Sequence, residues 1–187
     1  ALPNLSGLDA RAEELPPGWD QYEQVARNTR EFVKMPNDYY GFEHVDLSVG
    51  HADGCTGHYY HWAKAQGFDL DTLRGAANAI EVSDPAQHVW RTSVPEAIYP
   101  TTYITQCTEK YLREHAATRA VEPFFTVCSF PDPHHPFTPP GKYFDMYDPD
   151  AIPLPQSFND PHEHSTPQYK RMLRKRGQPL RARVNPF

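Results

Sequence analysis

The chain has 187 residues, a formal net charge of −6 at pH 7, 39% hydrophobic residues and 20 prolines. The length suits one ordinary domain, but the hydrophobic share is low for a self-sufficient core, and proline is about twice as common as usual. No apolar run approaches the roughly 20 residues of a membrane-spanning helix, and the first residues carry no signal-peptide pattern. We therefore expect no membrane partner, extensive proline-rich loops, and a piece of a longer protein.

The charges are distributed unevenly along the chain. No acidic residue follows Glu163, so the seven Lys and Arg residues of 164–187 give this tail a formal charge of +7. Residues 1–163 then carry a formal charge of −13. A basic tail can bind nucleic acid or an acidic surface, but few aromatic residues are interleaved here. We expect a solvated helix face, over 167–176, and no nucleic-acid partner.

The three cysteines are widely spaced and odd in number. This usage fits a reducing compartment better than a disulfide framework. It leans toward the cytoplasm and leaves the compartment open.

The first elements are expected to be short. Residues 1–18, rich in proline, indicate an irregular first segment. A helix is expected over 20–33, with Asp20 as its N-cap, and a strand within 39–49, where the apolar alternation is imperfect.

The histidine-rich stretch that follows allows two interpretations. Three glycines within 50–57 indicate a loop, and a short helix over 58–66 would end at Gly67. Two histidines would share one helix face, which suggests a metal site, but the aromatic neighbours favour packed, hydrogen-bonded histidines. The candidate ligands are His51, Asp53, His58 and His61.

The strongest helical pattern spans 99–117. Thr101 or Thr102 can serve as its N-cap, and apolar residues recur at helical spacing after it. Cys107 lies on the apolar face and is interpreted as core, not as a nucleophile. A shorter helix is expected near 70–79.

A seven-residue run without charge, Phe124–Phe130, lies between Pro123 and Pro131. It predicts a strand buried on both faces; a buried helix is the alternative, which the short length and the prolines disfavour. The Pro-Asp-Pro-His-His-Pro that follows ends the strand, so His134 and His135 would lie at its carboxyl end, where open α/β sheets bind ligands. The other interpretation is a stiff turn whose histidines cap exposed backbone.

Type I sulfatases, of the alkaline phosphatase superfamily, resemble this chain in their central segment, here FFTVCSFPDPHHPFTPPGKYFDMYDP. The preceding YPTTYITQCTEKYLREH resembles the same family. A third block resembles the bacterial branch close to phosphonate monoester hydrolases, namely YYGFEHVDLSVGHADGCTGHYYHW. The resemblance is strongest over residues 36–158, and it implies that 1–187 is a single, partial sulfatase domain.

The resemblance implies site residues in the proline-rich turn. His134 would enter the active site and bind the sulfate or phosphonate group, or handle the leaving-group proton. His135 would lie in the same substrate-binding region, facing outward or behind His134.

Other parts of the family pattern are missing from the sequence. No cysteine here begins the Cys/Ser-x-Pro-x-Arg motif whose cysteine becomes formylglycine, and the paired metal-binding aspartates, the Asp-His/Asn-Gly motif and the Gly-Lys-x-His motif are absent. The resemblance implies formylglycine and a divalent cation (Ca²⁺, Mg²⁺ or Mn²⁺) in the parent enzyme, with no metal ligand assigned here. We expect the 187-residue chain alone to be inactive.

The sequence therefore predicts a fragment of a sulfuric ester hydrolase. The alternatives are a phosphonate or phosphate ester hydrolase, a non-catalytic binding module, or an unrelated metal-binding protein. The expected fold is α/β, an alkaline-phosphatase-like sandwich whose mixed, mostly parallel sheet is flanked by helices. The expected partners are a small-molecule sulfate, phosphate or phosphonate ester, and the remainder of the sulfatase domain or a second copy.

Overall fold

The computed structural model describes residues 21–84, 88–159 and 164–175, and the chain divides into two compact units, 1–144 and 145–187. The expected irregular first segment, the Asp20 cap and the tail beyond residue 175 lie outside the described residues. Within the described part, no helix is both long and apolar enough to cross a membrane.

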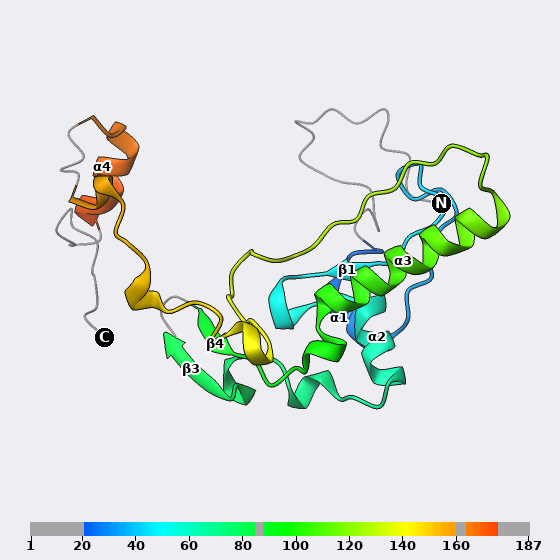
Figure 1. Cartoon of the computed structure of the whole chain (residues 1–187), viewed down its shortest axis with the longest axis horizontal. Coiled ribbons are helices and arrows are strands. Elements are labelled where there is room, and N and C mark those ends of the chain that lie inside the picture. The colour runs from blue at the N-terminus through cyan, green and yellow to red at the C-terminus, as the bar shows by residue number, and fades with distance from the viewer. Residues whose placement is uncertain (1–20, 85–87, 160–163, 176–187) are drawn as a thin grey trace. The chain divides into compact units, whose positions relative to one another are not determined.

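The core of the first unit lies between two helices, α2 (His58–Ala65) and α3 (Pro100–Thr118) (Figure 1). Their aromatic faces pack together with side chains of the connecting loops, and each fully buried large side chain contributes roughly 1.5–3 kcal/mol. Gly67 follows α2 with φ +88°, which confirms the predicted helix and its end. The cluster consists of Cys55, Tyr59, Tyr60, Ala63, Leu70, Val94, Ile98, Tyr99, Tyr103 and Ile104.

The helix predicted over 99–117 is confirmed as α3, but its cap is different. Tyr99 occupies the N-cap position and Pro100 the first turn, where a missing N–H costs nothing. Thr102 is inside the helix and donates its hydroxyl to the Glu96 carbonyl oxygen at 2.7 Å. Cys107 is partly buried against the core, as expected, and burial raises the pKa of its thiol to about 11.

The other predicted elements are shorter than expected. The helix predicted over 20–33 is only α1 (Val25–Arg30), and the one near 70–79 is a pair of 3₁₀ turns. The strand predicted within 39–49 is reduced to β1 (Ser48–Val49), because a tight turn at Tyr39–Phe42 interrupts the extended run.

Two small antiparallel sheets complete the first unit. Strand β1 pairs with β2 (Thr56–Gly57), and β3 (Glu81–Asp84) pairs with β4 (Val89–Arg91). Two single parallel bridges join β4 and the residue after it to the chain that follows the Pro131–Pro136 turn, at Val89–Phe137 and Thr92–Pro140. These bridges attach the turn to the body of the unit.

The buried strand predicted for Phe124–Phe130 is wrong for this chain. The segment is irregular and its side chains are exposed, with Phe125 at 77% and Val127 at 60%. It runs beside α3 in the opposite direction (Figure 1), and its backbone makes no hydrogen bond to the described residues. A strand exists only through ladder bonds to a neighbour, and the described part of the chain offers none here.

The 3₁₀ turns and the second unit account for the rest. The second unit contains α4 (Pro167–Lys175), which confirms the helix predicted over 167–176. The short 3₁₀ segments are η1 (Ala52–Gly54), η2 (Leu70–Thr72), η3 (Ala76–Asn78), η4 (Glu96–Ile98), η5 (Gly141–Tyr143), η6 (Pro149–Ala151) and η7 (Gln156–Asn159).

Candidate functional site

The proline turn places His134 where its outer nitrogen is free. The Nδ1 atom lies 2.7 Å from the carbonyl oxygen of His135, and since a carbonyl only accepts, Nδ1 carries the hydrogen and donates. The Nε2 atom therefore holds the lone pair of the neutral ring, or a second N–H of the charged ring. Both histidines are exposed, and their rings stack with centroids 4.3 Å apart.

His51 is the second ring at this place. Its centroid lies 3.7 Å from that of His134, with the two planes 15° apart. His51 belongs to the glycine-rich loop before β2, so the structure brings together the two sequence blocks that each resemble sulfatases. Sequence reasoning had assigned His51 to a different group of ligands.

That group, the candidate metal site, is not assembled. Asp53 is buried, and its Oδ2 atom accepts hydrogen bonds from Gly75 N at 3.0 Å, Trp90 Nε1 at 2.9 Å and Thr92 Oγ1 at 2.8 Å. His58 is also buried.

The histidine nitrogens of the same group are likewise engaged. His58 Nε2 donates to the Val33 carbonyl oxygen and Nδ1 accepts from Leu47 N, while His61 Nε2 lies 2.8 Å from the Asn28 carbonyl oxygen. Among the described residues, no three His, Cys, Asp or Glu side chains are placed to hold a metal. The packed, hydrogen-bonded interpretation of these histidines is the one that the structure supports.

A chain of hydrogen bonds connects the two blocks beneath the histidines. The Asp53 backbone N–H donates to Thr138 Oγ1 at 3.1 Å, and Thr138 lies 3.1 Å from the Tyr99 hydroxyl. Tyr99 in turn donates to Asp132 Oδ1 at 3.2 Å, in the same turn as His134. Sequence reasoning placed Asp132 beside the two histidines of the turn, but it missed Thr138 and Tyr99, because no local pattern marks residues that meet only in the folded chain.

Asp132 also contacts the start of α3. Its Oδ2 atom lies 3.5 Å from Thr101 Oγ1. Partial burial raises the pKa of Asp132, and the hydrogen bonds from Tyr99 and Thr101 oppose this effect. The Asp132 carboxylate thus connects the turn that contains His134 to the N-terminal end of α3, and its partial removal from water opposes its ionised form.

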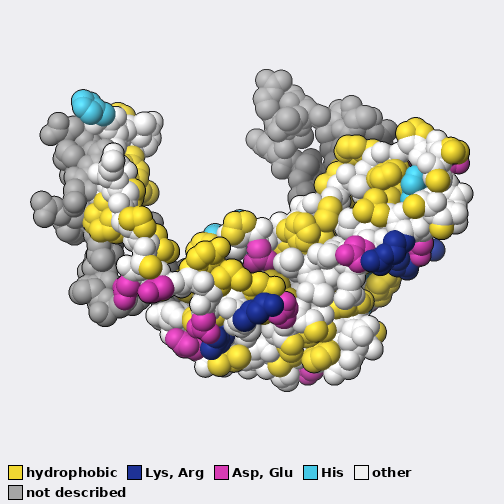
Figure 2. Space-filling model, viewed as in Figure 1, with side chains coloured by type: hydrophobic (Ala, Val, Ile, Leu, Met, Phe, Trp, Pro, Cys, Tyr) yellow, Lys and Arg dark blue, Asp and Glu magenta, His cyan; other side chains and the backbone are white. Residues whose placement is uncertain are grey.

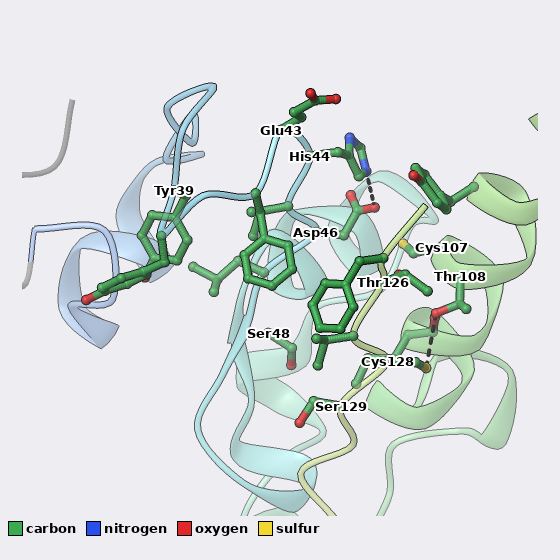
Figure 3. Close-up of a pocket in the computed structure, with 18 of the residues that line it drawn as sticks. Tyr39, Glu43, His44, Asp46, Ser48, Cys107, Thr108, Thr126, Cys128 and Ser129 are labelled. Atoms are coloured by element: carbon green, nitrogen blue, oxygen red, sulfur yellow. Dashed lines mark hydrogen bonds and ion pairs between the residues drawn. The ribbon is translucent and has the colours of Figure 1, made fainter. Parts of the chain in front are cut away.

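A groove of about 990 Å³ extends from the histidine pair along α3. It is lined by residues from 39–51, by residues from 122–134 and by one side of α3, which runs next to the second of these segments (Figure 3). His44 and Asp46, in the first of these segments, form an ion pair at 2.7 Å. Thr108 of α3 donates its hydroxyl to Cys128 Sγ at 3.1 Å and so connects the helix to the second segment (Figure 3). Figure 2 shows hydrophobic side chains gathered on the surface in this region.

Comparison with known proteins gives one partial match. An arylsulfatase from Clostridium perfringens (strain 13 / Type A) is 37% identical over 60 residues. Part of the chain is similar to an arylsulfatase. The matched residues are 32% of this chain and only 12% of that relative, so the chain spans a small part of the arylsulfatase's length.

The other two comparisons found nothing. No protein-family profile matches the chain, and no solved structure matches it.

Proposed function

We propose that the chain is one part of a sulfatase-type hydrolase that cleaves sulfate esters. The observation that carries the proposal is the contact between His51 and His134, which joins the two sulfatase-like blocks at one place. The partial similarity to an arylsulfatase is independent support. In this proposal, the carboxyl end of the Phe124–Phe130 segment is the anion-binding end.

His134 is the residue to which the proposal gives a chemical role. Its Nδ1–H is held by the His135 carbonyl oxygen, which orients the ring and leaves Nε2 to act on the substrate. When charged, Nε2–H can donate to an ester oxygen and pass its proton to the departing alkoxide. His135 serves through its backbone carbonyl, and its own ring stays at the surface of the turn.

Formylglycine and a divalent cation supply the nucleophile and the charge stabilisation in the family that the chain resembles. The residues present do not fit either group. None of Cys55, Cys107 and Cys128 begins the Cys-x-Pro-x-Arg motif from which formylglycine forms, and the described residues include no metal-binding cluster. The nucleophile and the metal ligands would therefore come from outside this chain, and the isolated chain would not turn over substrate.

The exposed segment Phe124–Phe130 supports the same proposal at the level of the fold. Its seven residues make no backbone hydrogen bond within the described part of the chain, and its large apolar side chains are exposed, so a neighbouring strand could pair with it on either side. In the proposed α/β sandwich, neighbouring strands from the remainder of the domain would fill the groove and pair with this segment. His134 would then lie at the carboxyl end of a completed sheet.

The experiment is to sequence the reading frame that encodes the chain and to assay its full product on an aryl sulfate, beside the 187-residue chain. The expected result is a Cys/Ser-x-Pro-x-Arg motif in the longer frame, turnover by its product, and none by the 187-residue chain. Turnover by the 187-residue chain, or none by a product that carries the motif, would overturn the proposal.

A phosphonate or phosphate ester hydrolase is the second candidate, because the same pocket chemistry binds any tetrahedral anion. Assaying an aryl phosphonate and an aryl phosphate in parallel separates it from a sulfatase. A full product without the nucleophile motif that binds these anions without turnover would identify a binding module instead.

A further inference from the structure

The stacked rings of His51 and His134 have ring nitrogens that no protein group of the described chain occupies. The rings come from different blocks and both side chains are exposed. Of their four ring nitrogens, only His134 Nδ1 has a hydrogen-bond partner in the described part of the chain. Three nitrogens are therefore available to a ligand from two adjacent parallel rings.

The nearest carboxylates in sequence do not occupy these nitrogens. Asp53, two residues after His51, is buried and bound by Gly75, Trp90 and Thr92. Asp132, two residues before His134, is engaged by the hydroxyls of Tyr99 and Thr101. Both carboxylates are held by other donors, and in the described part of the chain neither contacts the ring of His51 or His134.

The backbone around His51 is held in an unusual conformation. Gly50 has φ +100°, and Ala52, which is fully buried, has φ +50°. An alanine with a positive φ is strained, and a folded protein keeps such strain only where the surrounding contacts hold the residue in that conformation. The hydrogen bond from Asp53 N to Thr138 Oγ1 holds the backbone directly after Ala52 to the chain beyond the turn, close to the stacked rings of His51 and His134.

We propose that His51 joins His134 in binding one tetrahedral dianion, the sulfate or phosphate group of an ester. Two parallel imidazoles 3.7 Å apart can each donate to a different oxygen of the same anion, and charge-assisted bonds of this kind are about twice as strong as neutral ones. The class of ligand rests on the proposed function, whereas the role of His51 rests on the geometry alone.

The test is an NMR titration of the full 187-residue chain with sodium sulfate and, separately, inorganic phosphate, following the histidine ring signals. Saturable shifts are expected at His51 and His134. The His51→Phe variant keeps a stacked ring without nitrogens and is expected to bind about tenfold more weakly. His164→Phe alters an exposed histidine of the second unit, and it is the matched control with unchanged affinity.

His51→Gln retains one N–H donor and is expected to lie between the wild type and His51→Phe. If His51→Phe does not keep the native amide spectrum, the affinity of His51→Gln is the measurement that tests whether His51 binds the anion.

Tighter binding of sulfate favours sulfate esters as the substrate, and tighter binding of phosphate favours phosphate or phosphonate esters. Equal affinity in the wild type and a folded His51 variant, or no saturable shift in the wild type, overturns the inference and leaves the hydrolase proposal standing. Anion binding here, combined with a full product that has the motif and no turnover, overturns the hydrolase proposal alone.

Discussion

Asp53 and Asp132 each lie two residues from a histidine of the stacked pair, and they differ in burial and in the number of hydrogen bonds that they accept. Asp53 is 1% exposed and accepts three hydrogen bonds at one oxygen. Asp132 is half-buried and accepts from two hydroxyls. A buried carboxylate with several donors organises its neighbours, because removing it leaves each of those donors without a partner.

Replacing Asp53 tests this role directly. Asp53→Ala leaves Trp90 Nε1, Thr92 Oγ1 and Gly75 N unpaired in the core, and we expect it to lower the free energy of unfolding by roughly 3 kcal/mol or more. Urea denaturation measures the change. Asp46→Ala removes an exposed carboxylate from the same unit and is expected to cost less than about 1 kcal/mol. Similar losses in the two variants would contradict the network.

The raised pKa of Asp132 predicts a pH dependence of stability. Its folded-state pKa lies above its unfolded value, so the folded state binds more protons and this group's contribution to stability falls as pH rises through the folded pKa. Asp132→Asn removes the titration. We expect the stability of the variant relative to the wild type to improve as pH increases from about 4 toward neutrality. A constant difference across that range would show that burial does not destabilise the carboxylate.

Among the elements, the junction between β2 and α2 depends on one glycine. Gly57 has φ +84°, and a Cβ placed there would lie 2.6 Å from the Leu47 carbonyl oxygen. This oxygen also accepts the N–H of His58, so it cannot retreat without loss at the start of α2. The glycine therefore fixes both the small sheet and the helix that carries His58.

Gly57→Ala is expected to destabilise the unit by more than about 2 kcal/mol, from the left-handed φ and the backbone clash together. Gly67→Ala is the matched control, because Gly67 has φ +88° but no atom within 4 Å of a new Cβ. It should cost only the conformational part, roughly 1 kcal/mol. Equal thermal unfolding shifts in the two variants would refute the contribution of the Leu47 clash.

The elements also show what sequence reasoning can reach. Helices α2 and α3 were predicted because their apolar spacing and the Gly67 stop are local signals. The strand predicted over Phe124–Phe130 is wrong, because its composition indicates burial whereas a strand also needs neighbours, which the described part of the chain does not provide.

The candidate site follows the same division. His134 was proposed from the turn that contains it and stays a prediction, whereas its contact with His51 and the hydrogen bonds of Asp53 depend on residues far apart in sequence. A local pattern gives a residue's chemical type, and only the folded chain gives its partners.

At the scale of the whole molecule, the groove beside Phe124–Phe130 is the feature that a larger domain would cover. Cys128 lies on this segment and is exposed, whereas Cys55 is fully buried and burial raises the pKa of its thiol to about 12. A thiol reagent reacts with the thiolate of an accessible cysteine, so it should distinguish the exposed Cys128 from the buried Cys55.

We expect a maleimide to label Cys128 rapidly in the 187-residue chain and Cys55 only after unfolding. In the product of the complete reading frame, added strands would protect Cys128. Mass spectrometry of the labelled proteins measures both rates. Equal labelling of Cys128 in the two proteins would mean that the segment is not a buried strand of a larger sheet.

In the proposed sulfatase-type hydrolase, His134 acts on the ester. The most direct test of this role is the rate of aryl sulfate turnover by the full reading-frame product, compared between His134→Ala and His164→Ala. Loss of a general acid is expected to lower kcat by at least ~100-fold, whereas the His164 variant should retain wild-type turnover. Wild-type turnover by a folded His134→Ala protein would contradict the account.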